Sequence, residues 1–87
     1  MRLDKFLKVS RVIKRRTIAN EVCDAGRVSI NGRQAKPSTD VKPGDILEIA
    51  FGSGKSRIKV LQVKETVRKD DAAGLYEILE EGDALKA

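Results

Sequence analysis

Apolar side chains near the start of the chain recur at intervals of three and four residues, the spacing that places them on one face of a helix. Two such stripes predict helices over residues 1–9 and 17–25. The apolar positions are Leu3, Phe6, Leu7, Ile18, Val22 and Ala25. We expect the Thr17 hydroxyl to cap the second helix, and Gly26 to end it because glycine readily takes the left-handed conformation.

After Gly26 the pattern changes to the alternation of a strand. Residues 27–30 and 33–36 flank the dipeptide Asn31-Gly32. This dipeptide suits a two-residue type I′ turn, because both residues tolerate positive φ. The sequence therefore predicts a tight β-hairpin directly after the second helix.

Two further strands are predicted over residues 46–51 and 56–63, joined by a turn at residues 52–54. In the second of them the apolar alternation shifts between Val60 and Leu61, which indicates a β-bulge. The two segments are expected to pair as neighbours in one sheet.

The C-terminal part of the chain is ambiguous. Two aspartates suit the start of a helix, and we expect a helical turn over residues 70–79, although residues 76–78 would also suit a strand. Residues 81–87 are expected to fray. Together the elements predict an α+β fold in a single domain over residues 1–80.

Charge is divided unevenly between the two halves of this 87-residue chain, whose formal net charge is +5. Residues 1–37 hold ten Lys and Arg against three Asp and Glu, a balance of +7, whereas residues 38–87 hold eight against ten, a balance of −2. This distribution predicts one positive face. Nucleic acid, anionic lipid and an acidic protein are all partners that such a face would suit.

Several kinds of chemistry lack the residues that they need. The chain contains one cysteine and no histidine, which excludes an internal disulfide and a Cys/His zinc site. No nucleophile with an adjacent base is evident, so we expect no enzymatic activity, no cofactor and no metal. Cys23 is interpreted as a small, half-buried apolar residue of the second helix. Charges interrupt the N-terminal apolar run and no 18-residue apolar stretch exists, so we expect a soluble cytoplasmic protein with no membrane partner.

Two motifs resemble nucleotide or DNA sites without completing them. The segment GSGKS at residues 52–56 has the end of a phosphate-binding loop, but Ile49 replaces the required first glycine and a strand, not a helix, follows. Gly26 could be the turn glycine of a helix-turn-helix, but the predicted hairpin follows where the second helix should begin. A hairpin turn and a helix end are the preferred interpretations.

A basic surface remains as the candidate site, and no base-stacking aromatic platform accompanies it. The candidate RNA-binding residues are Arg2, Lys5, Lys8, Lys14, Arg15, Arg16 and Asn20, the last lying one turn after Arg16. Such a surface favours contact with phosphates and recognition of duplex or folded RNA by shape. A protein-interaction adaptor that uses its basic face, and an RNA-binding module that works with a separate RNA-modifying enzyme, are the alternatives.

Three motifs give the chain a family resemblance. They are Arg2-Leu3-Asp4-Lys5-Phe6-Leu7, the helix start Arg16-Thr17-x-Ala19, and Gly26-Arg27-Val28-Ser29-Ile30-Asn31-Gly32. With the Pro-Gly-Asp turn that follows, they resemble the RNA-binding domain named after small-subunit ribosomal protein four, the S-four domain, over about residues 1 to 63. The resemblance implies two N-terminal helices packed on a small, mostly antiparallel twisted sheet. Ile30 stands where Val is commoner in this family.

Within that superfamily the opening MRLDKFLKVSRVIKRRT resembles the free-standing RqcP family of bacterial ribosome quality control, which is related to the small heat-shock S-four proteins. The resemblance implies binding to large-subunit rRNA and peptidyl-tRNA on obstructed large ribosomal subunits. We expect the protein to be a monomer. It further implies assistance to RqcH in adding a C-terminal alanine tail. The family's rRNA-contacting arginines correspond to Arg2 and Arg16.

Overall fold

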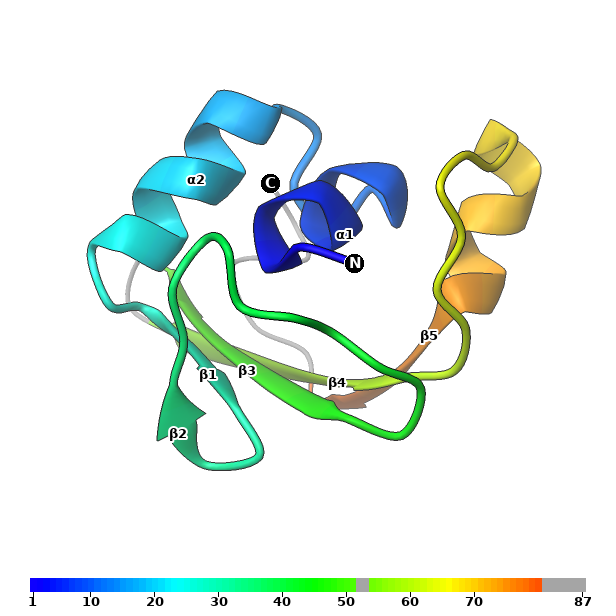
Figure 1. Ribbon diagram of the computed structural model, residues 1–87. Helices are drawn as coiled ribbons and strands as arrows, with labels where there is room; N and C mark the ends of the chain where they lie inside the picture. Colours follow the sequence, from blue (N-terminus) through cyan, green and yellow to red (C-terminus); the bar gives the residue numbers. More distant parts are fainter. Residues whose placement is uncertain (52–53, 81–87) are drawn as a thin grey trace.

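A computed structural model of the chain describes residues 1–51 and 54–80. Its centre is a five-stranded antiparallel sheet with strand order β2-β1-β3-β4-β5, and two helices cover one face of it (Figure 1). The elements in chain order are α1 (Leu3–Val9), α2 (Arg16–Asp24), β1 (Val28–Ile30), β2 (Arg33–Gln34), β3 (Ile46–Phe51), β4 (Gly54–Val60), the 3₁₀ helix η1 (Lys69–Leu75) and β5 (Tyr76–Glu80). The predicted α+β fold is confirmed.

Both predicted helices form, but the cap expected for the second is wrong. Helix α2 begins at Arg16, and Arg15 with its extended backbone is the N-cap residue. Thr17 already lies inside the first turn, where its hydroxyl is past the capping position, and no side chain of the described residues caps this helix. The helix ends at Asp24, one residue earlier than predicted, and Ala25 is an exposed C-cap residue instead of part of the buried stripe. Gly26 follows with the predicted left-handed conformation, a φ of 77°, and its amide donates to the Cys23 carbonyl at 3.0 Å.

The predicted hairpin forms on a turn with positive φ at both central residues, 52° at Asn31 and 84° at Gly32. This is the type I′ geometry that matches the twist of the flanking strands. The Asn31 side chain also holds the next strand. Its Oδ1 accepts the Ile46 amide at 2.9 Å, and its Nδ2 donates to Asp45 Oδ1 at 3.1 Å.

Strand β4 begins two residues and ends three residues earlier than predicted, and its irregularity lies at a different place. The strand ends at Val60, and the amides of Leu61 and Gln62 both donate to the Leu75 carbonyl instead. The shift in register falls between Arg57 and Ile58 against β5, so the bulge expected between Val60 and Leu61 is wrong. The predicted turn at residues 52–54 lies largely outside the described residues, and Gly54 already belongs to β4.

The ambiguous C-terminal region contains both of the structures considered for it. Helix η1 covers the first half, but a strand, β5, replaces the helix predicted to continue to residue 79. The strand forms because the open edge of β4 needs a partner, with Ile58 opposite Ile78 and Val60 opposite Tyr76. The fraying expected of residues 81–87 lies outside the described residues.

The helices and the inner face of the sheet enclose an aliphatic core. The buried stripe of α1 comprises the predicted Leu3, Phe6 and Leu7, and the α1–α2 connection adds Val12 and Ile13. The sheet contributes Val28, Leu47, Ile49, Ile58 and Val60. Exposed and buried residues alternate along β4, so its cations at residues 55, 57 and 59 lie on the outer face, away from the helices.

Candidate RNA-binding surface

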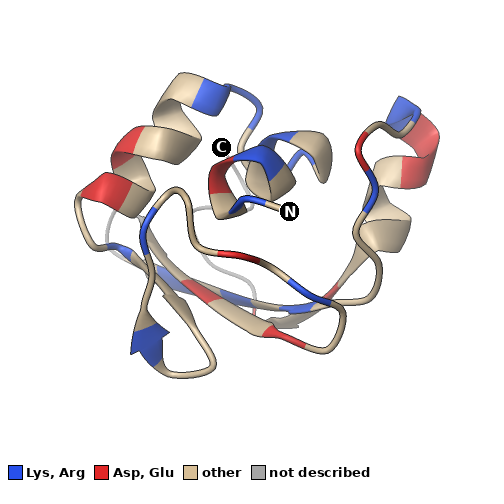
Figure 2. Cartoon of the chain, viewed as in Figure 1, with Lys and Arg blue, Asp and Glu red and all other residues tan. Residues whose placement is uncertain are grey.

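The predicted RNA-binding residues lie directly before α1, within the two N-terminal helices or in the connection between them. Figure 2 shows Lys and Arg in blue along this part of the chain. Arg2 precedes α1, Lys5 and Lys8 belong to α1, and the remaining four follow from the connection into α2. All are exposed except Lys5, which is half-buried. We call the six cations of this set, Arg2, Lys5, Lys8, Lys14, Arg15 and Arg16, the basic face.

A carboxylate between the helices brings three of the predicted residues together. Asp4 accepts hydrogen bonds from Arg2 at both oxygens, from Nε at 3.2 Å and from Nη2 at 3.3 Å. The Asn20 amide donates to Asp4 Oδ2 at 3.3 Å. Arg16 Nη2 lies 3.7 Å from Oδ1 of the same carboxylate. Arg2, Arg16 and Asn20 therefore surround one anion, although Arg2 directly precedes α1 and the other two belong to α2.

Backbone contacts fix the positions of Arg2, Arg16 and Asn20. Arg2 forms an isolated antiparallel bridge with Asp40, and on either side of it Leu3 N donates to the Thr39 carbonyl and Val41 N to the Met1 carbonyl, both at 2.8 Å. Arg16 and Asn20 are one turn apart on α2, so they emerge from the same side of that helix. The two guanidinium groups remain half-exposed, with 53% of the Arg2 side chain and 51% of the Arg16 side chain accessible. Each can still donate to a phosphate.

Asp4 is the residue of this cluster that the sequence prediction missed. Its side chain is only 3% exposed. Burial alone would raise the pKa of this carboxyl, but hydrogen bonds from Asn20, Arg2 and the Lys5 amide, together with the charge of Arg2, outweigh burial and lower the pKa. Its position carried a signal: Asp4 lies one turn before Leu7, at the border of the apolar stripe, where a side chain turns toward the neighbouring helix.

The other cations of the basic face are not gathered into that cluster. Lys5 forms an ion pair with Glu65, which draws the segment after β4 against α1. Lys8 lines a shallow groove of about 170 Å³ with Arg11 and with Glu65, Thr66 and Val67. Arg11 was not among the predicted residues, yet it is exposed and has a φ of 61°, which is uncommon outside glycine. Lys14 and Arg15 are exposed in the approach to α2.

The outer face of the sheet carries charges of both signs that pair with one another. Glu48 of β3 lies 3.4 Å from Lys55 Nζ and 3.6 Å from Arg57 Nη2. Arg57 also reaches Glu80 of β5 at 3.9 Å. This mutual neutralisation leaves the helical side as the more positive one.

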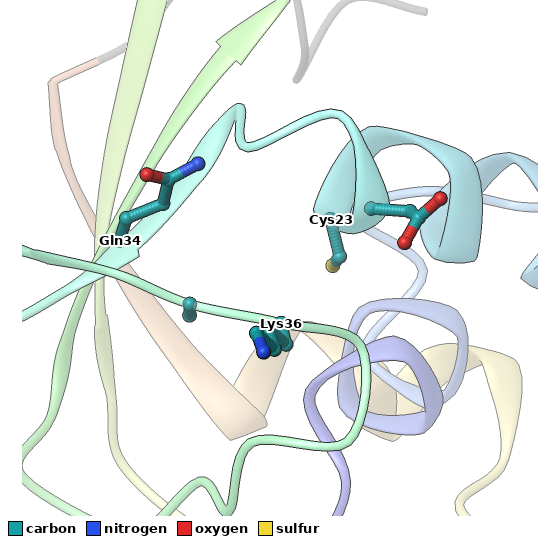
Figure 3. Close-up of a pocket in the computed structure, with 5 residues that line it drawn as sticks. Cys23, Gln34 and Lys36 are labelled. Atoms are coloured by element: carbon teal, nitrogen blue, oxygen red, sulfur yellow. The ribbon is translucent and has the colours of Figure 1, made fainter.

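A second pocket, of about 350 Å³, lies beside α2 and the hairpin (Figure 3). Cys23 lines it from α2, opposite Gln34 of β2 and Lys36. Cys23 is buried more deeply than predicted, and burial followed by the negative charge of Asp4 raises the pKa of its thiol to about 11. The thiol is therefore protonated at neutral pH and unreactive. Within the described ranges no group of three metal-ligating side chains occurs, and no helix is long and apolar enough to cross a bilayer.

Known proteins are similar to this chain in both sequence and fold. The family model for the S4 domain matches residues 1–47. A protein of Bacillus subtilis named RQC P-site tRNA stabilizing factor is 60% identical over 81 residues, which cover 93% of this chain and 94% of that protein. A protein of the same name from Halalkalibacterium halodurans is 58% identical over 87 residues, which cover 100% of this chain and 99% of that protein. The trimeric structure of Vibrio cholerae Heat Shock Protein 15 superimposes on this chain with a TM-score of 0.82 and 32% sequence identity. The match covers 90% of this chain and 80% of the Heat Shock Protein 15 chain.

Proposed function

We propose a function on the basis of the family to which the chain belongs. It belongs to the S4-domain family of RQC P-site tRNA stabilizing factors, where RQC denotes ribosome quality control. It is an RNA-binding protein of that process. More specifically, it binds large-subunit rRNA and peptidyl-tRNA on obstructed large ribosomal subunits. In this role it assists RqcH, which extends the stalled chain with C-terminal alanines in the cytoplasm.

The observation that carries this proposal is the pair of half-exposed guanidinium groups around one buried carboxylate. A guanidinium presents N–H donors in a planar fork that matches two phosphate oxygens, so each arginine can bind RNA in bidentate fashion. Arg2, at the start of α1, and Arg16, of α2, share Asp4, so they face the RNA as one unit. Lys14 and Arg15 extend the contact along the backbone of the same RNA.

The contribution to alanine tailing is positional and not catalytic. The chain has no histidine and a single cysteine, whose thiol is buried and protonated. What the basic face supplies is a fixed placement of tRNA relative to rRNA, while RqcH brings the next charged tRNA. If roughly four to six phosphates are neutralised, the log–log salt slope of binding should be about −3 to −5.

The protein acts as a monomer in this proposal, whereas the structure of its Vibrio cholerae relative is described as trimeric. Sedimentation equilibrium at micromolar concentration separates the two states. A monomer mass without RNA, and the mass of one protein chain bound to the RNA after RNA is added, supports the proposal. A trimer mass would contradict this part of it.

Co-sedimentation with large subunits that carry peptidyl-tRNA tests the binding site. Arg16→Ala should weaken binding by about 1–3 kcal/mol, the value expected for one well-formed arginine contact. Its folding cost should stay within about 0.5 kcal/mol, because the Arg16 side chain is half-exposed and its ion pair with Asp4 is long, at 3.7 Å. Arg2→Ala should weaken binding similarly, but it also removes two hydrogen bonds from a buried carboxylate and should cost about 1 kcal/mol of stability.

The matched control is Lys59→Ala, an exposed cation on the outer face of the sheet. Lys64 is less suitable, because it adjoins the segment that forms the groove with Lys8 and Arg11. Equal losses for Arg16→Ala and Lys59→Ala would refute a localised site and leave a diffuse positive surface. Binding that survives digestion of the RNA by nuclease would favour an acidic protein as the partner.

A further inference from the structure

We propose that Asp4 is a positioning residue for RNA binding: it sets the directions of the Arg2 and Arg16 guanidinium groups before RNA arrives. This inference rests on the proposed function, because it assigns Asp4 a task at the same site. Asp4 itself would not touch the RNA, since a carboxylate repels phosphate. It would act through the two arginines.

The hydrogen bonds around Asp4 fix both of its oxygens. Oδ1 accepts the Lys5 amide at 2.8 Å, which locks the carboxylate onto the first turn of α1. Oδ2 accepts Asn20 from α2. The carboxylate is therefore held from both helices before either arginine is considered.

Arg2 is then held in a defined orientation, because it donates to both oxygens of that fixed carboxylate. Arg16 approaches from α2 and points to the same anion. Ordering a long side chain before binding removes part of the entropic penalty of binding, which corresponds to about two- to tenfold in affinity for each side chain. The half-exposed guanidinium edges keep donors available to the ligand.

Electrostatics and positioning make opposite predictions for the loss of this carboxylate. A negative charge within the basic face weakens the attraction of that face for any RNA, so its removal should strengthen binding by charge alone. If Asp4 positions the arginines, its removal should instead weaken binding to the specific site. The sign of the effect therefore decides between the two.

The experiment compares Asp4→Asn with the unmodified protein on two ligands, large subunits carrying peptidyl-tRNA and an unrelated RNA duplex. The substitution keeps the shape of the side chain and removes one negative charge, which changes the formal net charge from +5 to +6. We expect subunit binding to weaken about three- to tenfold, with duplex binding unchanged or tighter. Tighter binding to both ligands would overturn the proposal, and so would weaker binding to both.

A double-mutant cycle separates this inference from the proposed function. In a protein already changed at Arg2→Ala and Arg16→Ala, Asp4→Asn should cause no further loss of subunit binding. A loss as large as that in the unmodified background would show that Asp4 acts through folding and not through the arginines. If the double alanine variant itself bound subunits normally, the proposed site would be wrong, whatever Asp4 does.

The unmodified protein gives a second test in case Asp4→Asn does not fold. Side-chain NMR of the arginine Nε–H groups should show an ordered, slowly exchanging signal for Arg2, which donates that group to Asp4 at 3.2 Å. Arg15, exposed at the start of α2, is the internal comparison and should be mobile. Equal mobility of the two groups would overturn the proposal.

Discussion

Replacing Arg11 by glycine should stabilise the fold and weaken RNA binding in the same variant. Arg11 has a φ of 61°, in the region where the Cβ atom of an L-residue costs about 1–2 kcal/mol. Glycine removes this cost but gives the unfolded chain more freedom, which offsets about 0.4–1 kcal/mol. The Arg11 amide still donates to the Lys8 carbonyl at 3.1 Å. The difference of these two ranges is a rise of about 0–1.6 kcal/mol in the free energy of unfolding, and its midpoint of about 0.8 kcal/mol corresponds to about 3–6 °C in Tm for a domain of this size.

The binding effect has a separate origin. The Arg11 side chain is exposed beside Lys8, and its loss removes one cation from the helical side of the molecule. If it contacts one phosphate, the log–log salt slope of binding should become shallower by about 1. Urea unfolding and a salt-dependent titration with large subunits measure the two quantities independently.

Arg11→Lys is the matched control for that variant. Lysine keeps both the charge and the Cβ atom, so stability and salt slope should stay close to those of the unmodified protein. A glycine variant that unfolds more easily would refute the strain assigned to Arg11. A glycine variant with an unchanged salt slope would refute its contact with RNA.

Three further predictions concern the fold. Gly26→Ala should cost about 1–3 kcal/mol of stability in thermal melting, because φ is 77° there; the Gln34 amide, 1.9 Å from the added Cβ atom, ends an exposed side chain that can move aside. Gly74→Ala, with open space around it, should cost almost nothing. Ser56→Ala should leave the free energy of unfolding in urea unchanged or raise it by up to about 1 kcal/mol, because the buried Ser56 hydroxyl has no hydrogen-bond partner in the described part of the chain. A clear decrease in stability would show that the hydroxyl does have a partner. Folding lowers the pKa of Asp4 from 3.8, so the stability that its ionised carboxylate contributes should be complete above about pH 4 and should be lost as the pH falls below that value. In an acid titration of the free energy of unfolding, Asp4→Asn should lack this loss of stability.

Local signals in the sequence were sufficient for the helices and the hairpin. The stripe of Leu3, Phe6 and Leu7 identified α1 because helix periodicity depends on neighbours within one turn. Asn31-Gly32 identified its turn because the two residues themselves permit positive φ. The same local reasoning failed for β5, whose conformation depends on pairing with β4 about twenty residues away.

The candidate site likewise combines features that the local sequence predicts with features that depend on distant contacts. Counting charges identified the basic face, since Lys and Arg clusters are visible in any sequence. It could not identify Asp4, whose role depends on contacts with Asn20 and Arg16, 16 and 12 residues later, that exist only once α1 packs on α2. The charge of Arg11 was equally visible; its left-handed backbone was not, because nothing in the local sequence indicates positive φ at a residue that is not glycine.

The central claim is that the basic face holds RNA on a large subunit that still carries tRNA. The most direct test titrates labelled protein against purified large subunits with and without peptidyl-tRNA, using the unmodified chain and Arg16→Ala. The unmodified protein should bind the tRNA-carrying subunits at least about tenfold more tightly, the factor that corresponds to 1.4 kcal/mol. Arg16→Ala should bind both kinds of subunit more weakly. Equal affinity of the unmodified protein for the two kinds of subunit, or an Arg16→Ala variant that binds as tightly as the unmodified chain, would contradict the claim.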